Sequence, residues 1–261
     1  MSTVPNTTDF ITIAGKKTQV MRGGKGPPLV YLHSAGGEMD WLPFHDKLAQ
    51  RFSLIAPAHP GFSLSEGLDK IDHIQDLAWH YVDFFEQLDL RGVPVVGFSL
   101  GAWLAVELAI LRPELVGKLI MVNAAGLRLE GAPMAEWFID DLDKMRQLLF
   151  HDPTSKIADE VMTLDEMHLL MFLRAREATA RVGWNPYLHN PKLPEHLRRV
   201  KSPTLVIWGR DDKLIPLAHG RYYADHIPGA RLEIVGECGH MLPFEKCDDF
   251  VRLVTEFTNE S

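Results

Sequence analysis

An apolar run that ends in a Gly-x-Ser-x-Gly turn and passes directly into a helical pattern is the feature that most constrains this chain. The turn is Gly97-Phe98-Ser99-Leu100-Gly101, and leucines recur behind it at helical spacing until Pro113. A serine on such a strand-to-helix turn has strained backbone geometry, and Gly97 and Gly101 leave room for close packing. The helix N-terminus behind Ser99 would also favour a developing negative charge. We therefore expect Ser99 to be a nucleophile, although an ordinary turn would give the same short pattern.

Short β-rich runs alternate with helical runs along the rest of the chain, which is typical of a mostly parallel sheet with helices on both faces. The expected strands are residues 10–13, 18–21, 29–32, 54–57, 94–98, 119–122, 204–208 and 231–235. The expected helices outside residues 127–194 are 73–89, 100–112, 217–226 and 244–257. The first two strands should form an antiparallel hairpin through Gly15. The predicted fold class is therefore α/β.

Residues 127–194 carry no strand pattern and interrupt the alternation after the sixth strand. Amphipathic helices are expected there at residues 135–149, 155–162 and 164–182. We interpret this insertion as a helical cap, with core segments at residues 1–126 and 195–261 on either side.

An activated serine needs a base within hydrogen-bond reach and an acid that orients the base. Of twelve histidines, His240 stands out because it follows the last expected strand, where ligands and catalytic groups gather in open α/β sheets. Asp211 and Asp212 follow the preceding strand, and both are candidates for the acid. The chain order Ser, Asp, His is the order expected of an α/β-hydrolase.

These motifs make the chain resemble the α/β-hydrolase fold superfamily along nearly its full length. In that family the acid usually stands fourth in Gly-x-x-Asp, which selects Asp212 and leaves Asp211 a local contact, such as one with Arg210. The resemblance also implies an oxyanion hole made by the backbone N–H groups of Ala35 and Leu100. It implies no metal or organic cofactor.

Within the superfamily, the chain is most similar to the group that cleaves carbon–carbon bonds in meta-cleavage products of aromatic catabolism. Residues 123–128, 210–212 and 237–240 support that similarity.

Three departures from that group's usual pattern concern the site itself. The group usually has a His-Gly-x-Gly-Pro-Gly loop, an asparagine before the nucleophile and a tryptophan after the histidine. This chain has His33-Ser34-Ala35-Gly36-Gly37, Phe98 and Met241. We expect His33 to hold the loop rather than act as a second base.

These substitutions place small or apolar groups where a polar dienol acid would bind, so we expect a serine carboxylesterase for a small or medium, largely apolar ester. The alternative is a carbon–carbon bond hydrolase, and a second alternative is a non-catalytic ligand-binding protein. Thioesterase, lactonase and perhydrolase activities would use the same residues. The expected pocket residues are Ser34, Phe98, Trp137, Met145 and Met241.

Composition limits the partners. The net charge of −8, without a basic cluster, argues against nucleic acid. The apolar stretch 102–111 is too short for a bilayer, and no secretory signal is apparent. Cys238 and Cys247 fit reduced thiols, Cys238 as a small buried residue. We expect a cytoplasmic protein acting on a small molecule without a membrane partner; the oligomeric state has no sequence signature.

Overall fold

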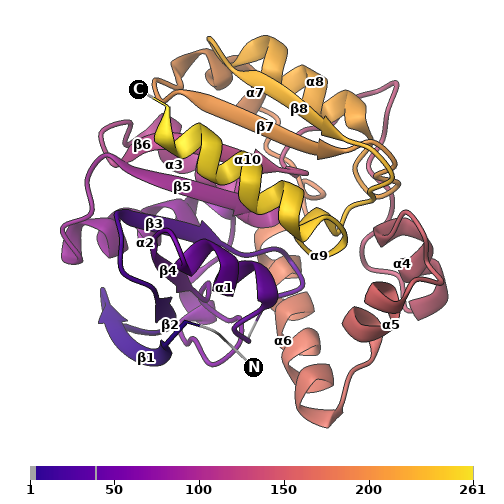
Figure 1. Ribbon diagram of the computed structural model, residues 1–261, viewed down its shortest axis with the longest axis horizontal. Helices are drawn as coiled ribbons and strands as arrows, with labels where there is room; N and C mark the ends of the chain where they lie inside the picture. Colours follow the sequence, from indigo (N-terminus) through magenta and orange to yellow (C-terminus); the bar gives the residue numbers. More distant parts are fainter. Residues whose placement is uncertain (1–3, 39, 261) are drawn as a thin grey trace.

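The computed structural model describes residues 4–38 and 40–260, and its centre is an eight-stranded sheet of order β1-β2-β4-β3-β5-β6-β7-β8 (Figure 1). The strands are β1 (Asn6–Ile13), β2 (Lys16–Gly23), β3 (Pro28–Leu32), β4 (Ser53–Pro57), β5 (Val93–Phe98), β6 (Val116–Val122), β7 (Thr204–Gly209) and β8 (Arg231–Val235). β1 pairs antiparallel with β2, and β2 with β4, whereas all pairings from β4 to β8 are parallel. The expected α/β fold is confirmed. The hairpin turns at Ala14 and Gly15, whose φ angles are both positive, at 46° and 79°.

Helices cover both faces of the sheet (Figure 1). One face packs against α2 (Ile74–Gln87), α3 (Leu100–Leu111) and α8 (Leu217–His226), and the other against α1 (Pro43–Ala49) and α10 (Cys247–Asn259). Alternation along β5 divides its side chains between the two apolar cores, since Val95 belongs to the first and Val96 and Phe98 to the second.

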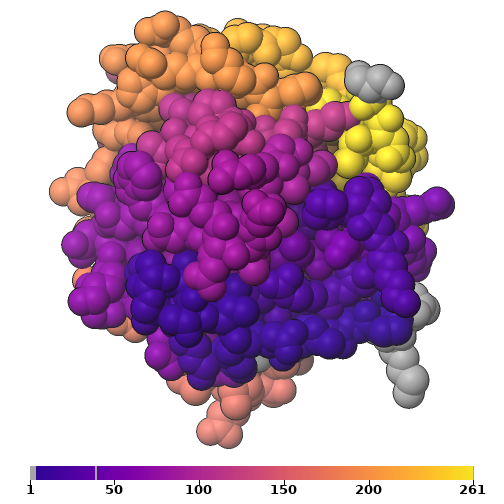
Figure 2. Space-filling model, turned by 90° about the vertical axis from the view of Figure 1, so that its left-hand side faces the viewer, coloured from indigo at the N-terminus to yellow at the C-terminus, as the bar shows by residue number. Residues whose placement is uncertain are grey.

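Three helices lie between β6 and β7, namely α4 (Leu142–Leu149), α5 (Lys156–Met162) and α6 (Glu166–Gly183). The expected start of the first, at residue 135, is wrong. Asp141 caps α4 by accepting hydrogen bonds from the N–H groups of Asp143 and Lys144, and the preceding residues run outside any helix. The segment around the start of α6 projects beyond the rest of the molecule in both views (Figure 1, Figure 2).

The remaining elements are short. They are the 3-10 turns η1 (Leu68–Lys70) and η2 (Leu197–Arg199) and the helices α7 (Leu193–His196) and α9 (Leu242–Glu245). The single helix expected at 244–257 is thus divided into α9 and α10, and α1 was not expected. None of the helices in the described residues is long and apolar enough to cross a bilayer.

Candidate active site

Ser99 lies between the end of β5 and the start of α3 with φ 55° and ψ −112°, a strained conformation for a residue with a side chain. The flanking glycines allow this turn. A Cβ on Gly97 would lie 2.3 Å from the carbonyl oxygen of Gly101, and one on Gly101 would lie 2.1 Å from that of Leu32. The turn therefore packs directly against β3, and only glycine fits at both positions.

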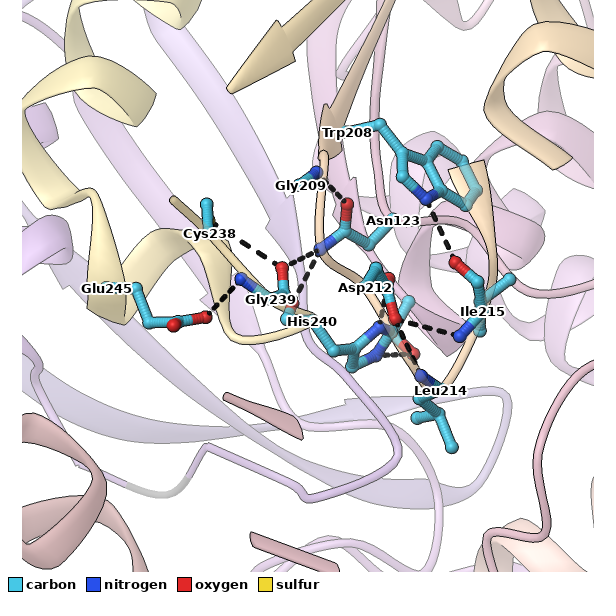
Figure 3. A network of polar contacts seen from close by, with 11 residues as sticks. Asn123, Trp208, Gly209, Asp212, Leu214, Ile215, Cys238, Gly239, His240 and Glu245 are labelled. Carbon is cyan, nitrogen blue, oxygen red and sulfur yellow. Dashed lines mark hydrogen bonds and ion pairs between the residues drawn. The ribbon is translucent and has the colours of Figure 1, made fainter. Parts of the chain in front are cut away.

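His240 connects Ser99 to Asp212. Its Nε2 lies 3.0 Å from Ser99 Oγ. Its Nδ1 lies 2.8 Å from Asp212 Oδ2 (Figure 3). The other carboxylate oxygen of Asp212 accepts hydrogen bonds from the N–H groups of Leu214 and Ile215, at 2.9 and 2.8 Å. All three polar side chains are at least 94% buried. The structure thus brings together the three residues expected from the sequence, with the distances needed for proton transfer from serine to histidine.

Asn123, at the end of β6, holds the His240 loop in place and was not singled out from the sequence. Its Nδ2 donates hydrogen bonds to the carbonyl oxygens of Gly239, at 3.2 Å, and His240, at 2.6 Å, and its Oδ1 accepts one from Gly209 N–H at 2.9 Å (Figure 3). The carbonyl oxygen of Leu149 also accepts hydrogen bonds from the N–H groups of His240 and Met241. The histidine loop is therefore fixed by β6, β7 and α4.

Asp211 makes a different contact. Its Oδ2 lies 2.8 Å from His151 Nδ1, on a partly exposed surface, so its ion-pair partner is His151 and not Arg210. Cys238, next to the histidine loop, is fully buried, and burial raises the pKa of its thiol. Neither side chain contacts Ser99 in any recorded interaction among the described residues.

Ala35 and Leu100 occupy the positions expected of oxyanion donors. Ala35 lines the same pocket as Ser99, and no described atom accepts a hydrogen bond from its N–H. Leu100 is the first residue of α3, where an amide N–H has no acceptor within the helix. Gly37, two residues after Ala35, has φ 71°, and its N–H donates to Ser34 O, which closes a tight turn in this loop.

His33 is part of a buried histidine pair beneath that loop. Its Nδ1 donates to Ser34 O at 2.8 Å, while its Nε2 accepts from His59 N–H at 2.9 Å. The two imidazole rings lie 3.7 Å apart. Burial lowers the pKa of His33 to about 4, so the ring is neutral at pH 7. These contacts agree with the expected structural role.

A cavity of about 420 Å³ opens above Ser99 and His240, between the sheet and the helices α4 to α6. Four of the five expected pocket residues line it, namely Ser34, Trp137, Met145 and Met241.

Phe98, the fifth, is not among the lining residues. Because side chains alternate along β5, Phe98 points into the core shared with α1 and α10, where it is fully buried. Its ring supports His240 from below, with the ring centroids 5.4 Å apart. The expectation that Phe98 makes the pocket wall apolar is therefore corrected.

The sequence model of the α/β hydrolase fold family matches residues 27–246 of this chain. The chain belongs to the α/β hydrolase fold family. Two of the relatives that match nearly the whole chain are hydrolases by name. A 2-hydroxymuconate semialdehyde hydrolase of Pseudomonas sp. (strain CF600) is 30% identical, covering 96% of this chain and 93% of its own. A 2-hydroxy-6-oxo-6-phenylhexa-2,4-dienoate hydrolase of Comamonas testosteroni is 28% identical, covering 98% and 97%.

Among solved α/β hydrolases, an esterase from Exiguobacterium antarcticum superposes with a TM-score of 0.81, covering 97% of this chain and 100% of its own. At 20% identity, that likeness concerns the fold alone. Hydrolase chemistry is thus supported by the family, while the bond that is cleaved is a separate question.

Proposed function

We propose that this α/β hydrolase is a serine carboxylesterase that cleaves a small or medium, non-anionic ester through an acyl-enzyme. The observation that carries the proposal is the charge of the pocket. No lysine or arginine occurs among the described residues that line it, whereas three carboxylates do, on Glu38, Asp40 and Glu160. An anionic substrate would have to be desolvated there without a cationic partner, which is costly.

The proposed mechanism follows from the contacts of Ser99. His240 takes the proton from Ser99 as its oxygen attacks the ester carbonyl, and Asp212 orients and stabilises the imidazolium. The N–H groups of Ala35 and Leu100 would hold the tetrahedral oxyanion, each contributing about 2.7–4 kcal/mol in the transition state. His240 then protonates the leaving alcohol and activates the water that releases the acyl group.

A carbon–carbon bond hydrolase of meta-cleavage products is the second candidate, and the relatives favour it more directly than they favour an esterase. One of the two relatives is by name a hydrolase of 2-hydroxymuconate semialdehyde, and the other is a hydrolase of a phenylhexadienoate. Ser99, His240 and Asp212 would serve that reaction as well. The acidic lining of the pocket is the observation that opposes it, since a dienoate is itself an anion.

A substrate panel separates these candidates. Purified protein and Ser99→Ala are assayed with p-nitrophenyl acetate, p-nitrophenyl butyrate and 2-hydroxy-6-oxo-6-phenylhexa-2,4-dienoate. We expect steady ester turnover with a kcat/KM at least tenfold above that for the dienoate, and a loss of about 10⁶ in kcat for Ser99→Ala. The opposite preference would establish the second candidate. A stoichiometric burst without turnover would favour a binding protein.

A further inference from the structure

Glu38 is a buried carboxyl group in the wall of the active-site pocket, and the proposed mechanism does not use it. Only 6% of its side-chain surface is exposed. Its Oε2 accepts a hydrogen bond from Ser34 N–H at 2.9 Å, which ties it to the loop that carries Ala35. Its Oε1 is buried and has no partner among the described residues. One acceptor in this wall is therefore unpaired next to the expected oxyanion loop.

The surroundings of Glu38 supply no fixed cation at neutral pH. His33 Nδ1 lies 3.8 Å from Glu38 Oε2, but it already donates to Ser34 O, and its pKa of about 4 keeps the ring neutral. Burial raises the pKa of Glu38 itself. A hydrogen bond from a bound molecule to a buried, unpaired acceptor contributes more binding free energy than one to an exposed acceptor.

The other charged side chains that line the pocket do not offset this acidity. Asp40 and Glu160 are acidic, and Glu160 pairs with Lys156 at 3.1 Å on the exposed side of α5. His168 lies between two carboxylates, with Nε2 2.8 Å from Asp40 and Nδ1 2.7 Å from Asp165. Hydrogen bonds to these carboxylates raise the pKa of His168. His168, the basic side chain that lines the pocket besides His240, is thus already paired, and the pocket favours donors over anions.

His240 determines where the alcohol part of a bound ester lies in this pocket. Glu38 and His240 both line the pocket above Ser99. His240 must also lie beside the leaving oxygen, because it returns the proton to the alcohol. A substituent one or two carbons from that oxygen would therefore project into the pocket that Glu38 lines.

We propose that Glu38 determines the substrate class of this pocket by accepting a hydrogen bond from an amine or hydroxyl on the alcohol part of the ester, and by rejecting a carboxylate there. This inference rests on the proposed esterase function. It predicts a preference that varies with one substituent while the scissile bond stays the same.

The experiment uses four butyrate esters that differ at the end of the alcohol. They are propyl butyrate, 2-hydroxyethyl butyrate, 2-(dimethylamino)ethyl butyrate and 3-(butanoyloxy)propanoate. The kcat/KM of each is measured at pH 7 by titrating the released acid, with the uncatalysed rate subtracted. The dissociation constant of each is measured on Ser99→Ala by calorimetry, which does not depend on turnover.

For the unaltered protein we expect the hydroxyl and amine esters to exceed the propyl ester about tenfold in kcat/KM and in affinity, and the carboxylate ester to fall below it. Glu38→Gln keeps an acceptor for Ser34 N–H and turns an amide N–H toward the pocket. It should lower the amine-to-carboxylate ratio at least tenfold. Glu66→Gln is the control, because the Glu66 side chain is 65% exposed and does not line the pocket, and its ratio should stay within about twofold of the unaltered protein.

The outcomes are distinct. Ester turnover without a donor preference overturns the role of Glu38 and leaves the esterase proposal intact. If Ser99→Ala binds the donor esters more tightly but the unaltered protein turns none of them over, the esterase proposal is overturned and the role of Glu38 stands. An equal effect of Glu38→Gln on all four esters would show that Glu38 only shapes the loop. If Glu38→Gln does not fold, the absence of a donor preference in the unaltered protein still overturns the role of Glu38.

Discussion

The side-chain amide of Asn123 donates a 2.6 Å hydrogen bond to the carbonyl oxygen of His240, so the end of one strand holds the loop of the candidate catalytic base. The same side chain accepts a hydrogen bond from Gly209, at the end of β7, the strand that precedes Asp212. One fully buried amide therefore sets the distance between the strand ends that carry the base and the acid.

Asn123→Asp tests this role. The carboxylate has nearly the same shape but cannot donate, so the carbonyl oxygens of Gly239 and His240 would lose their donor and face a negative charge. We expect a fall in the free energy of unfolding of about 3 kcal/mol and a fall in kcat larger than the change in KM. Urea unfolding and steady-state kinetics on the best ester measure both. Asn123→Ala should be no worse than the aspartate; an aspartate variant that behaves like the unaltered protein would show that packing alone matters.

The two adjacent aspartates should differ sharply in their effect on activity. In Asp212→Asn, the backbone N–H groups of Leu214 and Ile215 would hold the amide oxygen and turn the NH₂ group toward His240. The imidazole would then carry its proton on Nε2 and could not accept one from Ser99, so we expect kcat to fall about 10⁴-fold. Asp211→Asn removes a partly exposed pair with His151 and should change kcat by less than about threefold. The reverse order in parallel assays would mean that Asp211 is the acid.

Local sequence patterns were sufficient to predict the strands and the three central site residues. Ser99 and Asp212 each follow an apolar run that forms a strand, and His240 follows the alternating strand β8. The carboxyl ends of neighbouring parallel strands meet at one edge of a sheet. Proximity followed from topology, although the residues are far apart in sequence.

Features that depend on distant contacts could not be predicted in the same way. The partners of Asn123 lie 86 to 117 residues away, and the unpaired oxygen of Glu38 is defined only by the packed loop around it. Phe98 was misplaced because proximity to Ser99 in sequence outweighed the strand alternation that turns its side chain to the other face. The helix expected from residue 135 begins later because Ala135 N–H donates to Leu214 O in the core.

Acid should destabilise this protein through buried histidines, of which His80 gives the cleanest test. Only 1% of His80 is exposed, and neither ring nitrogen has a partner among the described residues. Burial, with a smaller effect of the Lys16 charge, lowers its pKa from 6.5 to about 3. Below pH 6.5, the His80 imidazole is therefore protonated in the unfolded chain but stays neutral in the folded chain. The stability from this group is complete above that pH and is lost as pH falls toward 3.

The measurement compares His80→Phe with the unaltered protein by urea unfolding at pH 7 and pH 5. Removing one such histidine should reduce the loss of unfolding free energy between these pH values by about 2 kcal/mol. Comparing two proteins cancels the contributions of other titrating groups. An identical pH dependence in both would mean that His80 is protonated in the folded protein or neutral in the unfolded chain.

The close contact between the serine turn and β3 makes Gly101 a position where one methyl group should disrupt both stability and activity. A Cβ there would lie 2.1 Å from Leu32 O and 2.5 Å from His33 O, and both are backbone atoms that cannot rotate away. Gly101→Ala must therefore push α3 from β3, which would move Ser99 away from His240. We expect a loss of about 3 kcal/mol in unfolding free energy, and a fall in kcat of at least 100-fold in the protein that remains folded. Gly131→Ala is the matched control, since a Cβ there meets no atom within 4 Å, and it should change stability by less than about 0.5 kcal/mol. If both variants unfold at the same urea concentration, the turn does not pack against β3 as closely as these distances require.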